Sequence, residues 1–173
     1  MIEDETDLLL FPPLRAGWAL RGQPAEVALS GFNARRVIFG GMNLRTGRRL
    51  FVIRERQRSG DFQIFLVALR KQYGKRPIAL ILDEDPSHTA KGSVALAQEL
   101  DITLLWLPKR SPELNPMDTL WGQAKDLLNA NRQYATIEKQ AARFVKYLKS
   151  LSDQEALRTS GVLSGHFWLR SVL

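Results

Sequence analysis

The sequence predicts a mixed α/β domain, with antiparallel and parallel strands in one sheet and helices on both faces. Short apolar or β-branched segments separated by Gly-containing turns occupy the first third of the 173 residues, as in an antiparallel meander. From residue 60 onward, segments of helical periodicity alternate with short apolar runs, as in parallel β-α units. A length of 173 residues, with 45% hydrophobic and 25% charged residues, fits one domain with a full core.

The first third is expected to consist of strands. Residues 1–13 start acidic and turn apolar, which predicts a strand with Asp4 near its start. Residues 15–24 carry Gly and Pro at turn spacing and are interpreted as a connection. Three further short strands are predicted, at residues 25–30, 35–39 and 49–53.

The middle of the chain alternates helices with strands. Residues 60–73 have helical spacing and end at Gly74, a residue suited to a helix C-cap. The continuous apolar run at residues 78–83 is typical of a central strand covered on both faces. A helix at residues 93–100 and a strand at residues 102–107 follow.

The last third is predicted to be helical. Asn115 as N-cap and Pro116 at the first helical position mark a helix start, and residues 137–151 form another helix. We divide the chain into a domain at residues 1–152 and a tail at residues 153–173 packed on or beside it. The apolar stripe of the first of these helices is Leu120, Trp121, Ala124, Leu127 and Leu128.

The formal net charge of +7 favours a polyanionic partner, with nucleic acid ahead of an anionic membrane. The absence of cysteine excludes disulfides and thiolate metal sites, and it is compatible with a reducing cytosol. Any metal would be held by oxygen ligands or by the two histidines. No apolar run approaches the roughly 20 residues that a membrane span needs.

Three acids on three different predicted elements are candidates for one metal site: Asp4, Asp83 and Asp118. Phosphodiester cleavage without a cysteine or serine nucleophile usually relies on divalent metals, and Mg²⁺ prefers carboxylate and water oxygens. Each acid also has a structural interpretation. Asp4 lies in a terminal acidic cluster that solvent can satisfy, Asp83 can cap the turn after its strand, and Asp118 suits the first turn of a helix.

Three sequence blocks contain these acids. The third is the most specific, and 34 residues separate Asp83 from Asp118. The blocks are Asp4-Glu5-Thr6-Asp7-Leu8 with Gly17-Trp18-Ala19-Leu20-Arg21-Gly22 after it, Leu80-Ile81-Leu82-Asp83 with His88, and Leu107-Pro108 through Ser111-Pro112-Glu113-Leu114-Asn115-Pro116-Met117-Asp118 to Leu120-Trp121. Together they resemble the catalytic domain of the DDE/DDD transposases of the mariner-related bacterial insertion-sequence family.

The resemblance implies a ribonuclease-H-like fold in which Asp4, Asp83 and Asp118 bind Mg²⁺ or Mn²⁺, as two ions. It implies that water nicks double-stranded DNA at the element ends and that the freed 3′-hydroxyl attacks target DNA. Supporting roles fall to His88 and Glu5. We expect a homodimer or a larger assembly on DNA, in the bacterial cytoplasm at the nucleoid.

The sequence departs from the family pattern at three places. The third acid is Asp118, as in the mariner branch, where many insertion-sequence relatives carry Glu. Asp83 is followed by Glu84-Asp85 where relatives often have Asn-Ala. Family members carry an upstream helix-turn-helix region, but this sequence begins three residues before Asp4. End recognition would then need a separate helix-turn-helix chain, or the sequence is a fragment.

Basic residues gather between residues 45 and 76 and again before the third acid. They predict a phosphate-contact surface, although a solvated hairpin edge protected by charge is the structural alternative. The candidate DNA-binding residues are Arg48, Arg49, Arg54, Arg56, Arg58, Lys109 and Arg110.

The aromatic residues are weaker signals. Trp18 and Trp121 can stack on bases, but Trp121 falls on an apolar helix stripe and is expected in the core, as are Trp106 and Trp168. No role is assigned to His166.

Three functions therefore compete. The first is a transposase catalytic domain that cuts and joins DNA, and the second is a ribonuclease-H-like nuclease without strand transfer. The third is a catalytically silent DNA-binding or assembly remnant of a transposase.

Overall fold

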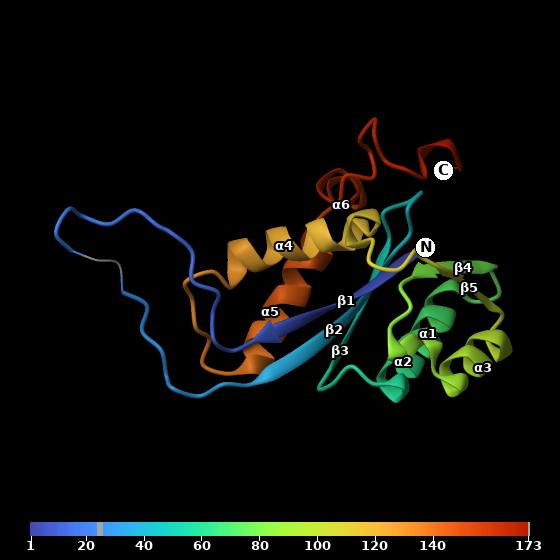
Figure 1. Ribbon diagram of the computed structural model, residues 1–173, viewed down its shortest axis with the longest axis horizontal. Helices are drawn as coiled ribbons and strands as arrows, with labels where there is room; N and C mark the ends of the chain where they lie inside the picture. Colours follow the sequence, from blue (N-terminus) through green and yellow to red (C-terminus); the bar gives the residue numbers. More distant parts are fainter. Residues whose placement is uncertain (24–25, 173) are drawn as a thin grey trace.

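A five-stranded mixed sheet forms the centre of the computed structural model, which describes residues 1–23 and 26–172 (Figure 1). Its strands lie in the spatial order β3-β2-β1-β4-β5. β1 pairs antiparallel with β2, and β2 with β3, whereas β1–β4 and β4–β5 are parallel. The predicted mixed sheet is therefore confirmed. The strands are β1 (Ile2–Leu9), β2 (Arg35–Met42), β3 (Arg49–Arg54), β4 (Ile78–Leu82) and β5 (Ile102–Trp106).

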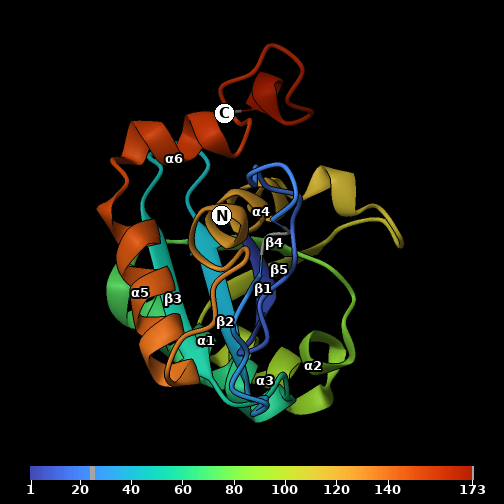
Figure 2. The ribbon, with the colours of Figure 1, turned by 90° about the vertical axis from the view of Figure 1, so that its left-hand side faces the viewer.

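Helices cover both faces of the sheet (Figures 1 and 2). Residues of α4, α5 and α6 form one core cluster, around Trp121 and Phe144, and residues of α1 and α3 form the other, around Phe62 and Phe65. The bounds predicted for α1, α3 and α5 and the start of α4 agree to within two residues. The helices are α1 (Ser59–Tyr73), α2 (Pro86–Thr89), α3 (Lys91–Glu99), α4 (Pro116–Leu128), α5 (Ile137–Ser150) and α6 (Asp153–Thr159), with 3₁₀ turns at Pro112–Leu114 and Arg170–Val172.

The strand predicted at residues 25–30 is wrong for residues 26–30, which adopt no regular structure, and Ala25 lies outside the described residues. The described parts of residues 10–34 form a loop that reaches away from the sheet, so no neighbouring strand pairs with them (Figure 1). The base of the loop is tied to the segment after α4, since Asn131 bonds the backbone of Arg15 and Gln133 bonds Phe32. Trp18, in this loop, is fully exposed.

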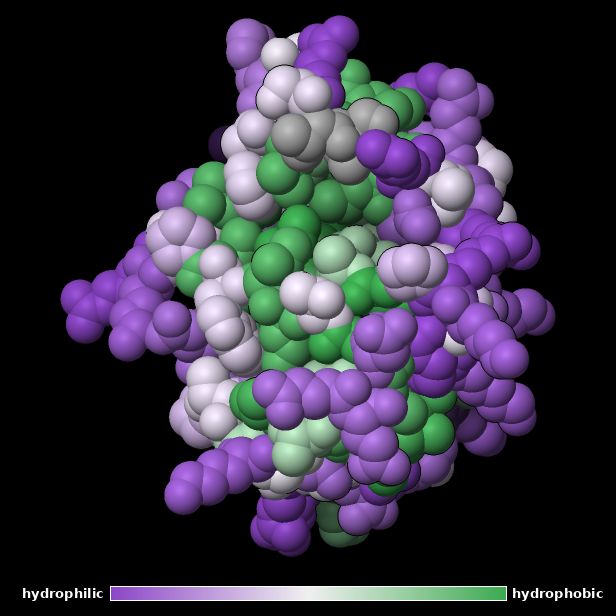
Figure 3. Space-filling model, turned by 90° about the vertical axis from the view of Figure 1, so that its right-hand side faces the viewer, coloured by the Kyte–Doolittle hydropathy of each residue, from purple (hydrophilic) through white to green (hydrophobic). Residues whose placement is uncertain are grey.

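The prediction that β4 is covered on both faces holds only in part. Ile78, Leu80 and Leu82 are buried against α1 and α3. On the other face Ile81 is half-buried and packs against the core cluster that contains α4 and α5, but Ala79 is exposed. The helices of that other face lie over β1, β2 and β3. Figure 3 shows an apolar strip on the side that carries β4 and β5. Trp106 is 40% exposed there, so its predicted core position is not observed.

The tail packs partly onto the core cluster around Trp121 and Phe144. Ala156 and Leu157 of α6 are buried with α4 and α5, and Phe167 and Leu169 pack beside them. Trp168 is 42% exposed and donates from Nε1 to the carbonyl of Leu114, so it is not the core residue predicted. Leu173 lies outside the described residues. In the stripe predicted for α4, Leu127 is likewise exposed.

Within residues 1–23 and 26–172, no helix combines the length and apolar character that crossing a membrane would require.

Candidate active site

The register of two parallel strands brings the first two acids together. Ile2 of β1 pairs with Ile81 of β4, so two residues further along each strand Asp4 lies level with Asp83. Asp83 directly follows β4, and the carboxyl ends of parallel strands are where α/β sheets usually form sites. Side chains alternate along β1, and this places Asp4 on the face covered by α4 and Glu3 and Glu5 on the face of α2.

Asn115 positions the third acid, because it both caps α4 and attaches this helix to β1. Asn115 caps α4 by accepting the backbone N–H of Met117. Its side-chain Nδ2 donates to the backbone carbonyl of Glu3 at 2.9 Å, so the helix N-terminus is attached to β1 beside Asp4. Asp118, in the first turn of α4, is therefore held near Asp4 and Asp83, and all three line one pocket.

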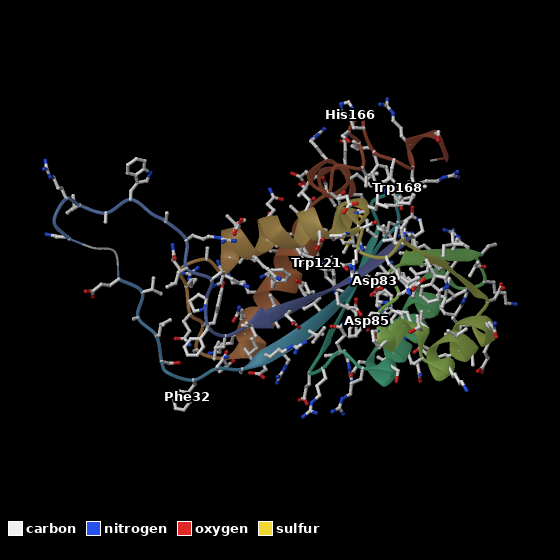
Figure 4. All side chains as sticks on the ribbon, viewed as in Figure 1. Phe32, Asp83, Asp85, Trp121, His166 and Trp168 are labelled. Carbon is white, nitrogen blue, oxygen red and sulfur yellow. The ribbon has the colours of Figure 1, made fainter. Side chains whose placement is uncertain are left out.

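Asp4, Asp83 and Asp118 line one pocket of about 410 Å³. Glu84, Asp85 and the loop from Leu107 to Pro112 also line it. In Figure 4, Asp83 and Asp85 lie where β4 leads into α2, and Trp121 lies between α4 and the sheet. His166, in contrast, lies on the C-terminal segment and lines a separate pocket that also includes Asp118.

Asp4 is the most buried of the three acids. Its Oδ2 accepts a hydrogen bond from Nε1 of Trp121 at 2.9 Å. Burial, together with the charges of Asp118 and Glu5, raises the pKa of Asp4 to about 8, although the bond from Trp121 acts in the opposite direction. Burial and the neighbouring acids therefore disfavour the ionised form of Asp4.

Asp83 is held by donors on one oxygen. Nδ1 of His88 lies 3.0 Å from Oδ1 of Asp83, and the backbone N–H of Asp85 donates to the same atom at 3.0 Å. The hydrogen bond from His88 lowers the pKa of Asp83 and outweighs the effect of partial burial. Asp83 is therefore ionised, with Oδ2 left over for another partner. Asp85 caps α2 through Ser87, as an N-cap residue does.

His88 connects Asp83 to the acids of β1. The ring is buried, with its centre 4.4 Å from that of Phe62, and its Nε2 lies 2.8 Å from Oε1 of Glu5 and 3.5 Å from Oε2 of Glu3. Burial by itself lowers the pKa of His88, but the bonds to Asp83 and Glu5 and the charge of Glu3 outweigh it and raise this pKa to about 11. This pKa favours the imidazolium form of His88, in which both ring nitrogens donate to carboxylates.

Glu3 is fully buried, and neither of its side-chain oxygens has a hydrogen-bond partner within the described structure. Burial and the charge of Glu5 raise its pKa well above the usual range. Glu3, Glu5 and His88 bring potential metal-ligating atoms within 4.8 Å of one another. Because the ring of His88 already bonds Glu5 and Asp83, we interpret the group as a buried ion-pair cluster.

The donor set of the pocket fits a hard divalent cation. The three acids offer only oxygen, which Mg²⁺ and Mn²⁺ prefer. Burial raises the pKa of Asp118 as well, partly offset by the charge of Lys125. Partly buried carboxylates disfavour each other's ionised form, and a cation bound among them makes the ionised form favourable again.

The predicted basic residues differ in how far they are exposed. Arg48, Arg56, Arg58 and Arg110 are exposed, and Lys109 pairs with Glu84 on the rim of the pocket while remaining 78% exposed. Arg49 differs, because its side chain is 5% exposed and donates to the carbonyls of Gly47 and Leu151. Arg54 is intermediate and pairs with Asp61 at 2.6 Å.

Four arginines line a groove beside the acidic pocket. Arg56 and Arg58 are exposed, whereas Arg36 and Arg54 are half-buried and held in ion pairs. Arg36, Arg54, Arg56 and Arg58 contribute to a hollow of about 500 Å³. Arg56 and Arg58 also line the next hollow, which extends to Asp85, and Asp85 lines the acidic pocket. We call the surface formed by Arg36, Arg54, Arg56 and Arg58 the basic groove. It leads through Asp85 to Asp83.

Sequence reasoning missed two residues near the acids. Trp121 was assigned to the core, and it is buried, but its N–H bonds Asp4. Lys125, further along α4 than Asp118, is half-buried beside Asp4, Asp7 and Asp118, and burial lowers its pKa despite these charges. The helical spacing from Asp118 to Lys125, which places both on one face of α4, was the available signal.

Comparison with known proteins extends these observations. The family model for DDE superfamily endonucleases matches residues 1–155. The insertion element IS630 uncharacterized 39 kDa protein of Shigella sonnei is 26% identical over 152 residues, which is 87% of this chain and 44% of that protein. The chain thus spans about half the length of the curated relative it matches.

Solved structures of the Mos1 transposase share the fold. The paired-end complex with the left transposon end matches with a TM-score of 0.72 at 19% identity, over 96% of this chain and 52% of that chain. The mariner Mos1 paired-end complex with Mg matches with a TM-score of 0.75 at 18% identity, over 99% and 54%. The ribonuclease-H-like fold and the family resemblance inferred from the motifs are confirmed. Because the family model covers most of its length, the chain belongs to the DDE superfamily endonucleases.

Proposed function

We propose that this chain is the catalytic domain of a transposase, which nicks double-stranded DNA and transfers the freed 3′-end to target DNA. Mg²⁺ or Mn²⁺, as a pair of ions, would be held by Asp4, Asp83 and Asp118. The observation that carries the proposal is that these acids, from β1, β4 and α4, line one pocket. The similarity to structures of the Mos1 transposase with Mg, with Mn and with a transposon end supports it.

In the proposed reaction the cation supplies the activation of water and the stabilisation of charge, and the residues of the chain supply its position. A divalent cation in such a site lowers the pKa of water and stabilises the attacking and leaving oxygens of an in-line displacement. The residues of the chain fix where this happens. Oδ2 of Asp83 and Oδ1 of Asp4 are the oxygens not engaged by ring N–H groups. Asp118, exposed at the N-terminus of α4, completes the set.

Glu5 and His88 support Asp83 in this proposal. Glu5 accepts from Nε2 of His88 and thereby orients the ring, whose Nδ1 then faces Asp83. A carboxylate–histidine pair of this kind restricts the rotation of the ligand and keeps it ionised. Both residues act through Asp83 and do not touch DNA.

Double-stranded DNA would approach along the basic groove. Its positive charges neutralise phosphates without reading sequence, and the groove leads to the acidic pocket. Lys109 and Arg110, which line the acidic pocket itself, provide further contacts. Arg49 is left out of the proposed surface because carbonyl groups of the chain already bind it. A homodimer or larger assembly on DNA, with end recognition by a helix-turn-helix region, completes the proposal.

A plasmid assay tests the function. Supercoiled plasmid and a labelled oligonucleotide with a free 3′-hydroxyl are incubated with the chain and Mg²⁺ or Mn²⁺. We expect relaxed circles and label joined covalently to the plasmid, both suppressed by EDTA. Nicking without joined label would indicate a nuclease without strand transfer. DNA binding with no product in either metal would indicate a silent remnant.

The basic groove makes a second prediction. Replacing Arg56 and Arg58 by alanine is expected to weaken nonspecific duplex binding about equally for all sequences. The salt slope of log K is expected to fall by about 1 for each phosphate that the variant no longer neutralises. Fluorescence anisotropy between 50 and 200 mM salt, roughly the range where such slopes are measured, gives both quantities.

Lys146 and Lys149, exposed on α5, provide the matched control for the groove variant. Their replacement by alanine removes the same amount of charge from a surface outside the basic groove. An equal weakening of duplex binding in the Lys146→Ala, Lys149→Ala variant would mean that net charge, not the groove, binds DNA.

A further inference from the structure

Trp121 is one of the largest fully buried side chains, and yet its polar atom bonds Asp4, which lines the acidic pocket. The ring packs against Phe51 and Phe144, with ring centres 5.7 and 6.2 Å away. Its Nε1–H, the one polar group of the side chain, donates to Oδ2 of Asp4 at 2.9 Å. The hydrophobic stripe of α4 therefore ends in a directed hydrogen bond to a proposed metal ligand.

The sheet is built to admit this ring. Gly40 of β2 pairs with Asp4 of β1, so the two residues face the same side of the sheet. A Cβ atom at Gly40 would lie 2.4 Å from Cη2 and 2.5 Å from Cζ2 of Trp121. Any side chain at position 40 would push the indole away. The absence of a side chain there lets the ring lie over β2, with its N–H directed at β1.

The bond has a geometric consequence for Asp4. A carboxylate held at one oxygen by a fixed donor has its rotation restricted, and the other oxygen is directed away from that donor. Trp121 is fixed in turn by the surrounding aromatic rings, so the donor itself has little freedom. Asp83 is held in the same manner by Nδ1 of His88. Both strand acids thus have one oxygen bound to a buried ring N–H.

We propose that Trp121 is a positioning residue for metal binding, whose indole N–H holds Oδ2 of Asp4 so that Oδ1 is presented to the cation. This inference rests on the proposed function, because it takes Asp4 as a metal ligand. A tryptophan that served only the core would contribute to the stability of the fold alone. A positioning residue also sets the affinity of the site for the metal, typically by about 10- to 100-fold.

Direct Mn²⁺ binding separates these roles without reference to catalysis. The signal of free Mn²⁺ in electron paramagnetic resonance gives the dissociation constant of the full chain. Trp121→Phe retains a buried aromatic ring and loses the N–H, and we expect about 10-fold weaker binding. Substitution by benzothienylalanine, which keeps the two-ring shape and replaces N–H by sulfur, is expected to give the same loss with less disturbance of packing.

Phe144→Leu is the matched control. Phe144 packs on Trp121 and has no polar group, so this change loosens the same core and leaves the N–H in place. We expect it to lower the unfolding midpoint and to keep the Mn²⁺ dissociation constant within about 2-fold of the parent. Circular dichroism at the temperature of the titration verifies that each variant is folded.

The Asp4→Asn background tests the role of Trp121 separately from the role of Asp4 as a metal ligand. If Trp121 acts through Asp4, Trp121→Phe weakens Mn²⁺ binding in the parent and adds nothing once Asp4 is asparagine. Undiminished Mn²⁺ affinity in folded Trp121→Phe, or an equal loss in both backgrounds, would overturn the inference and leave the proposed function standing. Parental affinity in Asp4→Asn itself would overturn both.

Discussion

Replacing Asp83 by asparagine is expected to abolish metal-dependent nicking and to leave nonspecific DNA binding nearly intact. Asparagine keeps the size of the side chain and can still accept from His88 and from the N–H of Asp85. It offers no charge to a cation. Losing several kcal/mol of metal stabilisation in the transition state corresponds to about 10³-fold in rate. Plasmid relaxation rates in Mg²⁺, with duplex binding measured by anisotropy, give both quantities.

Asp101→Asn is the control for this variant. This substitution removes the same charge as Asp83→Asn does. Asp101 lies in the turn between α3 and β5, at the opposite end of the parallel strands from Asp83. Its φ is +52°, a conformation that asparagine adopts readily. We expect its nicking rate to stay within about 2-fold of the parent, as for a surface change remote from the site. Equal activity in Asp83→Asn and the parent would remove Asp83 from the metal site.

The replacement of His88 by phenylalanine is expected to have the largest effect on stability. It removes the imidazolium that lies between Glu5 and Asp83 and leaves Glu5 and Glu3 buried without a cation. Breaking a buried ion pair from one side typically costs about 3 kcal/mol or more. Urea unfolding followed by circular dichroism is expected to show a decrease of that order in the free energy of unfolding.

Two further variants make the His88 result specific. Thr89→Ala alters the neighbouring, exposed residue of α2 and is expected to change stability by no more than about 0.5 kcal/mol. Adding Glu5→Gln to His88→Phe removes one of the uncompensated charges and is expected to restore part of the lost stability. If the double variant were less stable than His88→Phe by the full cost of Glu5→Gln alone, the two residues would be uncoupled, contrary to their 2.8 Å contact.

The parts of the site that sequence could predict are those encoded by local chemistry. Asn115-Pro116 marks the start of α4 because an N-cap acceptor and a residue without an N–H suit that position. The apolar run of residues 78–82 likewise predicts β4, and the charged Asp83 marks its end. That Asn115 also bonds the carbonyl of Glu3 is a long-range contact, and no spacing rule encodes it.

What sequence could not predict depends on which elements lie beside one another. Residues 26–30 have the composition of a strand, but a strand forms only where a partner edge is available, and the loop leads away from the sheet. β4 has the composition of a strand covered on both faces, but on one face only Ile81 packs against the helices and Ala79 is left exposed. Arg49 resembles its exposed neighbours in sequence, and only the fold directs it into the junction between α5 and α6.

Trp121 shows the same limit within the site. Its position on an apolar stripe predicts a core residue, which is correct, but periodicity cannot say where the N–H of a buried indole points. That direction depends on Gly40, which is distant in sequence and adjacent in the sheet.

The central claim, that Asp4, Asp83 and Asp118 bind divalent cations together, is tested most directly by anomalous X-ray scattering from crystals soaked in Mn²⁺. The account predicts anomalous peaks in the pocket, within about 2.2 Å of carboxylate oxygens from all three aspartates or bridged to them by water. Manganese bound elsewhere, for example among Glu3, Glu5 and His88, with the pocket of the three aspartates lacking a peak, would contradict it.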